Sequence, residues 1–232
     1  MSKIAIIAAE NTEIMAIRNI MKEVREKKIY NLTIFEGKIK DKECILTEAG
    51  IGKVNAARTT QIIIDNYEIK TLINVGSAGG INKELDITDI VIGKDFVQYD
   101  FDVTAAGHEK GYVSGIGTRI KATEELVDKC KNVIKRIENK NYKTVIGTIA
   151  TADMFCTDKN IAKEVRENFN AECVEMESAA IAQVCLLDKI PFLVIRSISD
   201  SPNGNNAMDF KKYISFAAKR CADILEELVK EI

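Results

Sequence analysis

The sequence predicts an α/β fold in which helices cover both faces of a mixed or parallel β-sheet. Short runs rich in β-branched residues alternate along the chain with segments of helical periodicity. Most of these runs are too apolar to have a face in solvent. With 232 residues, of which 46% are hydrophobic and 29% charged, the chain can bury a large core. Because no linker or repeat divides it, we expect a single domain over residues 1–232.

The expected strands share an aliphatic, β-branched composition. They are residues 3–8, 32–39, 44–48, 71–75, 90–99, 145–150 and 192–199. The expected helices share an apolar stripe with a spacing of three and four residues. They are residues 13–24, 54–66, 124–138, 159–168, 177–187 and 209–230. In a sheet of this kind ligands bind beyond the carboxyl ends of the strands.

Charge and hydropathy exclude several classes of partner. A formal net charge of -2 leaves no basic surplus for a nucleic acid backbone. The N-terminal apolar run from Ile4 to Ala9 ends at Glu10, which makes it too short for a signal-peptide core or a membrane span. We therefore expect a cytoplasmic protein with neither nucleic acid nor membrane as partner.

The cysteine and histidine content argues against metal and disulfide chemistry. The cysteines show no C-x-x-C spacing and are Cys44, Cys130, Cys156, Cys173, Cys185 and Cys221. Free Cys behaves as a small hydrophobe, so we expect buried free thiols. The single histidine, His108, leaves no basis for a histidine zinc site or a Ser-His-Asp triad. No metal is expected.

Two stretches near the C-terminal end place acids where a chain normally buries apolar groups. Val174-Glu175-Met176-Glu177 leads into a predicted helix, and Arg196-Ser197-Ile198-Ser199-Asp200 closes an apolar strand. An ionised carboxylate is costly to bury unless it is paired, hydrogen-bonded or used. The pattern therefore predicts a polar pocket cut into the core, as in an enzyme.

Two glycine-containing stretches are weaker evidence for a ligand site than the buried acids. The run Gly76-Ser77-Ala78-Gly79-Gly80 follows the strand at 71–75, and we expect either a tight structural turn or a close approach of the backbone to a ligand. It is not G-x-G-x-x-G, which disfavours a nicotinamide or flavin cofactor. Gly50-Ile51-Gly52-Lys53 lacks the first glycine and the Ser or Thr of a P-loop, which excludes ATP binding of that kind.

Six segments in order resemble the 5′-methylthioadenosine/S-adenosylhomocysteine nucleosidases, a family of the nucleoside phosphorylase superfamily. They are Ile6-Ile7-Ala8-Ala9 with Glu13, Gly50-Ile51-Gly52-Lys53-Val54, Gly76-Ser77-Ala78-Gly79-Gly80, Asp102-Val103-Thr104-Ala105, Val174-Glu175-Met176-Glu177 and Arg196-Ser197-Ile198-Ser199-Asp200. The resemblance implies a three-layer αβα sandwich with a central mixed sheet, and a homodimer. It also implies hydrolysis of the N-glycosidic bond of adenine thionucleosides without metal or cofactor.

Hydrolysis of such a bond needs an acid, a base and a group that stabilises charge. Adenine leaves poorly as an anion, so its N7 must gain a proton while water attacks the opposite face of the ribose. By resemblance, Asp200 is the acid at N7 and Glu13 activates the water. Glu177 grips the ribose hydroxyls.

Further substrate-binding residues carry over from the resemblance. Ser77 and Arg196 would face the ribose and the catalytic acids, Met176 would pack on the sugar, Phe155 would stack on adenine, and the Cys156 backbone would bind the adenine edge. The predicted site also includes Ile51, Gly79, Glu175 and Phe210. Phe155 and Met176 as plain core, and Arg196 as a structural ion pair, remain alternatives.

Several alternatives for the activity stay open. Phosphorolysis is disfavoured because Asn74 stands where hexameric phosphorylases of this superfamily have an arginine for phosphate. Glu10 and Ala106 replace apolar residues that the family usually has around the 5′ substituent, so 5′-deoxyadenosine, adenosine or aminodeoxyfutalosine remain candidate substrates. A protein that binds adenine nucleosides without cleaving them is the alternative outside the enzymes.

Overall fold

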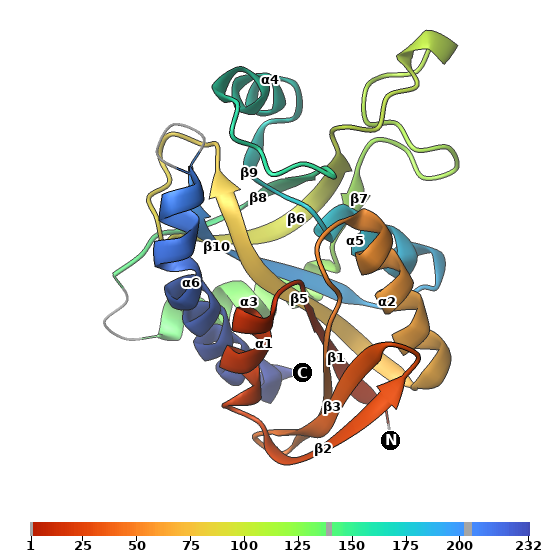
Figure 1. The fold of residues 1–232 in the computed structure, drawn as a ribbon, viewed down its shortest axis with the longest axis vertical. Coiled ribbons are helices and arrows are strands. Elements are labelled where there is room, and N and C mark those ends of the chain that lie inside the picture. Colours follow the sequence, from red (N-terminus) through yellow and green to blue (C-terminus); the bar gives the residue numbers. More distant parts are fainter. Residues whose placement is uncertain (1, 138–140, 202–205) are drawn as a thin grey trace.

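A computed structural model of the chain describes residues 2–137, 141–201 and 206–232. Figure 1 shows one mixed β-sheet with helices on both faces, which confirms the predicted α/β fold. The strands are β1 Lys3–Ala8, β2 Lys22–Ile29, β3 Leu32–Ile39, β4 Lys42–Glu48, β5 Ile69–Gly80, β6 Ile90–Gln98, β7 Ile120–Lys121, β8 Thr144–Thr151, β9 Ala171–Glu175 and β10 Phe192–Asp200. The helices are α1 Asn11–Arg18, α2 Lys53–Asn66, α3 Glu124–Arg136, α4 Lys159–Phe169, α5 Ser178–Leu187 and α6 Asn206–Leu228, with short 3₁₀ turns at Thr104–Ala106 and Val229–Glu231.

The sheet folds back on its central strand, β5. β5 runs parallel to β1 on one side and to β10 on the other. Its last residues pair with β9, which continues through β8 and β6 back to β10. These pairings close a ring, so the carboxyl ends of β1, β5 and β10 and the end of β9 meet at one place.

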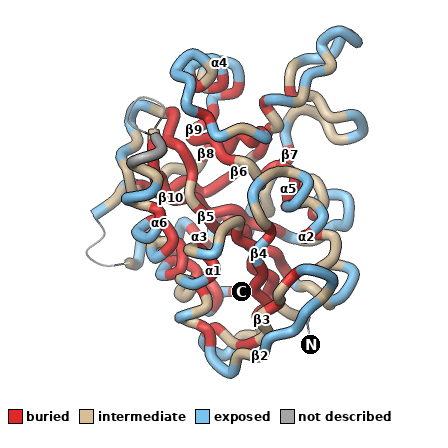
Figure 2. Tube along the Cα trace, in the orientation of Figure 1, coloured by how far each residue is buried: buried red, intermediate tan, exposed pale blue. Residues whose placement is uncertain are grey.

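Three apolar clusters hold the layers together. One packs α1, α3 and α6 against one face of the sheet, and a second packs α2 and α5 against the other. A third lies under α4, beside β8 and β9. Figure 2 shows the buried central strands between these layers. None of the described helices is long and apolar enough to cross a membrane.

Apart from the two-residue strand β7, which was not predicted, the predicted elements agree with the structure except in three places. The helix expected over residues 13–24 ends at Arg18, and Val24 lies in β2. β2 has the sequence KEVREKKI and is largely exposed at the edge of the sheet. An exposed edge strand needs no apolar face, so its sequence gives no strand periodicity. The end predicted at residue 138 for the third helix lies outside the described residues.

The other two differences affect the site. The run Gly76 to Gly80 is no tight turn, because β5 continues through it to Gly80. The strand β9 was not predicted at all, since it is only five residues long and its last residue is the buried acid Glu175. The six cysteines are free and buried, as predicted.

Candidate active site

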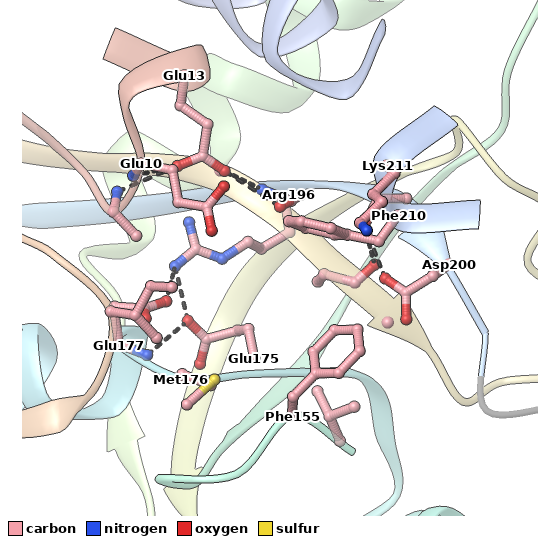
Figure 3. A pocket seen from close by; sticks show the side chains of 18 residues that line it. Glu10, Glu13, Phe155, Glu175, Met176, Glu177, Arg196, Asp200, Phe210 and Lys211 are labelled. Carbon is pink, nitrogen blue, oxygen red and sulfur yellow. Dashed lines mark hydrogen bonds and ion pairs between the residues drawn. The ribbon is translucent and has the colours of Figure 1, made fainter. Parts of the chain in front are cut away.

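A cavity of about 460 Å³ opens where these strand ends meet, a size typical of small-molecule sites. Strand ends, the turns after them and the first turn of α1 supply most of its polar residues, while α6 and the segment before α4 supply aromatic walls. Figure 3 shows the lining side chains converging from these separate elements. The buried charged residues are only 1% to 8% exposed, and they are Glu13, Glu175, Glu177, Arg196 and Asp200.

Glu13 is held by four hydrogen bonds just beyond the end of β1. Its Oε2 accepts from the backbone N–H of Ala9 and Glu10, at 3.1 and 3.2 Å. Its Oε1 accepts from the backbone N–H and the hydroxyl of Ser77, at 2.9 and 3.1 Å. Glu13 occupies the third position of α1, where a side chain reaching back to the cap residue stabilises the helix start. The same contacts fix its carboxylate at the cavity wall.

The glycines of β5 are required by the side chains that cross them. A Cβ on Gly76 would lie 2.9 Å from Arg196 Nη1 and 3.0 Å from Glu13 Oε1. A Cβ on Gly79 would lie 3.3 Å from Asp200 Oδ2. Neither glycine has a positive φ, so the requirement is for space rather than for a turn. Gly76 therefore marks a point that Arg196 and Glu13 approach from two sides.

Arg196 and Glu175 form a buried ion pair at the floor of the cavity. Arg196 Nη2 lies 2.6 Å from Glu175 Oε2 and also donates to Asn74 and to the Ser178 hydroxyl. Glu175 Oε2 accepts from the backbone N–H of Ser178 at 2.8 Å, and its Oε1 accepts from the Thr151 hydroxyl. Burial alone raises the pKa of Glu175, but the guanidinium and these hydrogen bonds hold it below its usual value.

One edge of the Arg196 guanidinium is left for a ligand. Within the described residues, Nε and Nη1 of Arg196 are buried without a hydrogen-bond partner. An unpaired buried donor is costly, and Nη1 lies on the Gly76 side, next to Glu13. The arrangement provides a donor and an acceptor that can hold one small polar molecule between them.

Glu177 has a different environment although it lies only two residues from Glu175. It occupies the N-cap position of α5 without a side-chain cap hydrogen bond, and its Oε1 accepts from the backbone N–H of Gly52 at 3.0 Å. The Arg196 guanidinium is 4.0 Å from its Oε2 and is already engaged by Glu175. Burial, together with the neighbouring Glu175 carboxylate, raises the pKa of Glu177 to about 8.

Asp200 ends β10 after an irregularity in its pairing with β5. Ile198 pairs with Ala78 and Asp200 with Gly79, so Ser199 is an extra residue in the ladder. Such a bulge changes the direction of the side chain that follows it. The Ser199 hydroxyl donates to Asp200 Oδ1 at 2.7 Å. Asp200 is thereby brought to the cavity although its strand is otherwise apolar core.

The remaining predicted residues form the apolar walls. Phe155 and Phe210 meet edge to face with ring centroids 5.8 Å apart, and Ile51 and Met176 also line the cavity. Cys156 does not line it, but lies in a small adjoining pocket with Phe155, Met176 and Asp200. Ala106 is exposed and outside the cavity of this chain.

Among the polar residues, sequence reasoning missed three contributors. Asn74 is a buried polar residue inside an apolar strand, which is the signal that could have found its contact with Arg196. Ser199 and Lys211 line the cavity, but a hydroxyl and a lysine at these positions carry no distinctive pattern. No group of three or more His, Cys, Asp or Glu in the described part of the chain is arranged to hold a metal ion.

The fold and the cavity define a class. Residues 3–230 match the family model described as "Phosphorylase superfamily". A 5′-methylthioadenosine/S-adenosylhomocysteine nucleosidase of Geobacillus sp. (strain WCH70) is 39% identical over 231 residues, which are 99% of each chain. The chain belongs to the 5′-methylthioadenosine/S-adenosylhomocysteine nucleosidase family of that superfamily.

Solved structures agree with this assignment. A putative nucleosidase of this family from Borrelia burgdorferi B31, bound to adenine, is 39% identical with a TM-score of 0.92, covering 99% of this chain and 100% of that one. The Neisseria meningitidis enzyme in complex with methylthio-immucillin-A is 33% identical with a TM-score of 0.94, covering 100% of both chains. A futalosine hydrolase of Helicobacter pylori is 29% identical with a TM-score of 0.94, covering 100% of this chain and 98% of that one.

Proposed function

We propose that the protein hydrolyses the N-glycosidic bond of 5′-methylthioadenosine and S-adenosylhomocysteine, releasing adenine and the 5′-thioribose, on one catalytic domain of residues 1–232. The observation that carries this proposal is that Asp200, Glu13 and Glu177 line one buried cavity from three separate elements. An acid and a base held in one water-poor site are what the reaction needs. The adenine and methylthio-immucillin-A bound by two relatives support the substrate class.

Asp200 acts as the acid. As the glycosidic bond breaks, electrons flow into the purine and Asp200 gives a proton to N7, so adenine leaves neutral. The bulge at Ser199 and the hydrogen bond from its hydroxyl fix the direction of the carboxyl group. Phe155 and Phe210 bound the adjacent apolar space, in which a planar base fits. The backbone at Cys156 meets the adenine edge.

Glu13 and Arg196 act on the water. The water sits over Gly76, where Arg196 Nη1 donates to it and the Glu13 carboxylate accepts its proton. The four hydrogen bonds to Glu13 keep the carboxylate in place during the attack. A fixed carboxylate also stabilises the positive charge that develops on the ribose.

Glu177 binds the ribose hydroxyls. Its carboxylate is held on one oxygen by the Gly52 N–H and is not tied up by a close cation. Two hydroxyl donors can therefore compensate a buried carboxylate that is otherwise costly to keep charged. Met176 packs on the sugar from the turn between β9 and α5.

Adenine release measured with and without phosphate tests the proposal. We expect equal rates of adenine release from methylthioadenosine in both conditions, with free thioribose and no ribose phosphate as product. A requirement for phosphate would instead indicate phosphorolysis. Binding of methylthioadenosine without any release of adenine would indicate a nucleoside-binding protein.

A second candidate activity is the cleavage of aminodeoxyfutalosine. The similarity to a futalosine hydrolase, at 29% identity over the whole chain, favours including this substrate. It shares the adenine base and ribose, so the acid at N7 and the attacking water would act identically. Comparing its kcat/KM with that of the two thionucleosides decides between the activities.

Assembly and location belong to the same proposal. We infer a homodimer, in which the exposed 102–107 segment reaches the partner's pocket and the exposed apolar side chains of Ile51, Val54, Leu186 and Leu187 become covered. A mass near 25.8 kDa by light scattering, with full activity, would contradict this. Six free thiols agree with a reducing cytoplasm, where the reaction would serve methionine salvage.

A further inference from the structure

The cavity contains two charged residues that the proposed reaction does not use. Among the residues that the structure describes, five acidic and two basic ones line it. Arg196 is paired with Glu175, and Glu13, Glu177 and Asp200 have roles in the reaction described above. Glu10 and Lys211 remain. The proposed function assigns binding of the adenine and the ribose to the other residues. Any role of Glu10 and Lys211 in substrate selection therefore rests on that proposed function.

Glu10 and Lys211 belong to the open side of the cavity. Glu10 is half-buried at the cap of α1, and Lys211 is exposed near the start of α6, directly after Phe210. Phe155, an exposed lining residue at 44% that the inferred dimer does not cover, marks the same transition to solvent. Figure 3 shows Glu10 and Lys211 entering the pocket from two different elements.

The 5′ substituent of a bound nucleoside must extend toward this open side. With the base at Asp200 and the ribose hydroxyls at Glu177, both buried at the closed end, the 5′ carbon is the position of the nucleoside that these residues leave unengaged. A small methylthio group would end among the apolar walls. A longer substituent would pass Phe210 and reach the charged residues beside the opening.

The surroundings of Glu10 favour a positive charge. Burial and the carboxylates of Glu13 and Glu48 raise the pKa of Glu10 above its usual value. An ammonium next to Glu10 would relieve the repulsion among these three acids. Lys211 lines the same cavity with the opposite charge, so a substituent that carries both signs meets a partner for each.

We propose that Glu10 and Lys211 select a zwitterionic amino-acid group on the 5′ sulfur, with Glu10 accepting from its ammonium and Lys211 pairing with its carboxylate. S-adenosylhomocysteine carries this group and methylthioadenosine does not. Ion pairs at half-exposed positions contribute up to about 1 kcal/mol, which is about a fivefold change in kcat/KM. Each matched charge therefore raises kcat/KM for S-adenosylhomocysteine by a modest factor relative to a substrate without that charge.

A set of 5′ substituents that differ in charge tests this. The substrates are butylthioadenosine as the neutral one, aminopropylthioadenosine as the cation, carboxypropylthioadenosine as the anion, and S-adenosylhomocysteine as the zwitterion. Glu10→Gln should lower kcat/KM for the cation and the zwitterion about fivefold relative to the neutral substrate. Lys211→Met should do the same for the anion and the zwitterion. Raising the salt concentration should reduce both differences.

Matched controls separate this effect from a general change in charge. Glu26→Gln and Lys212→Met remove exposed charges that neither line the cavity nor shift the pKa of Glu10, and they should leave all four ratios unchanged. Glu10→Lys is a second variant, in which the preference should shift from the cation to the anion. Unchanged ratios in the Glu10 and Lys211 variants, with methylthioadenosine still cleaved, would overturn this inference and leave the proposed function standing. Failure of the wild-type protein to cleave any adenine thionucleoside would overturn the proposed function and this inference with it.

Discussion

Glu175 and Glu177 lie two residues apart, at 8% and 6% exposure, in two regions of the same cavity that behave oppositely. In the floor, Arg196 lies 2.6 Å from Glu175, and the pKa of that acid is below its usual value. In the second region, the part of the wall formed by Glu177 and Gly52, Gly52 contributes only an N–H to Glu177. Burial raises the pKa of that acid to about 8. Burial by itself therefore does not decide whether an acid is charged here, whereas a close cation and the hydrogen bonds around it do.

The two regions are suited to different tasks. An acid that is paired and accepts several hydrogen bonds keeps its position and its charge, and thereby orients Arg196. An acid without a close cation retains the capacity to respond to a ligand. The floor is thus expected to matter for stability, and the wall together with Asp200 for chemistry.

Asp200→Asn should have the largest effect on catalysis. An amide can hydrogen-bond adenine but is a very poor proton donor, so kcat should fall by about 10³- to 10⁴-fold while the unfolding temperature stays near that of wild type. Adenine release in single-turnover experiments measures this loss. Asp188→Asn, at an exposed acid after α5, is the control and should retain full activity. Near-normal turnover of Asp200→Asn would remove this residue from the mechanism.

Glu175→Gln should show the structural role of the floor. The change leaves the buried Arg196 charge uncompensated, which typically costs about 3–5 kcal/mol in the free energy of unfolding. Because the pKa of Glu175 is lowered in the folded protein, its contribution is present above its ordinary pKa of 4.5 and is lost as the pH falls through the folded value. Urea unfolding at neutral pH measures the loss.

The matched control for Glu175→Gln is a partly exposed acid of the same strand. Glu172 in β9 lies 3.1 Å from Arg166, and its side chain is 13% exposed. Glu172→Gln should cost about 1 kcal/mol or less, as is typical of more exposed pairs. Equal costs for the two variants would contradict the distinction between the floor and an ordinary ion pair.

Glu177→Gln should change stability in the opposite direction. The folded pKa of about 8 lies above the ordinary value of 4.5, so the folded ligand-free protein binds the proton more tightly than the unfolded chain. Wild type therefore loses stability as the pH rises from about 4.5 to about 8, while glutamine has no proton to lose. At pH 8 the variant should be more stable than wild type by about 1 kcal/mol or more.

Unfolding of Glu177→Gln and wild type at two pH values checks the sign. The advantage of the variant should be small at pH 5 and should grow toward pH 8. The variant should also bind methylthioadenosine more weakly, because it has lost the carboxylate that receives the ribose hydroxyls. An advantage that does not depend on pH would show that Glu177 is already charged before a ligand binds.

Lys53→Met should have the smallest effect. Lys53 Nζ lies 2.6 Å from Asp100, and the neighbouring Gly52 donates the N–H that holds Glu177. Loss of this half-buried pair should raise KM by a few-fold and lower stability by about 1 kcal/mol. Lys129→Met, which removes an exposed pair with Glu125 on α3, is the control and should not change KM. An unchanged KM in Lys53→Met would show that this ion pair does not contribute to holding Glu177.

Most of the fold was predictable from local patterns. Strands such as β1 and β3 match the predicted ranges at both ends, because buried strands must be apolar throughout or alternate. β2 was missed because it lies at an exposed edge, and β9 because it is short. The sequence left the glycines of β5 open between a tight turn and a close approach to a ligand, because the atoms that require them, on Arg196 and Glu13, are remote in sequence.

The sequence by itself indicated a polar site, since acids at the ends of apolar strands are costly to bury unless they are paired, hydrogen-bonded or used, and the family resemblance gave roles to Glu13, Glu177 and Asp200. Only the tertiary structure decided which acid receives the cation. Arg196 is 21 positions from Glu175 along the chain and within 2.6 Å in space. Only the tertiary structure likewise brings Glu10 and Lys211, from opposite ends of the chain, to one cavity. Charge, pKa and selectivity depend on distances between side chains, and these distances exist only after the strands have been brought side by side.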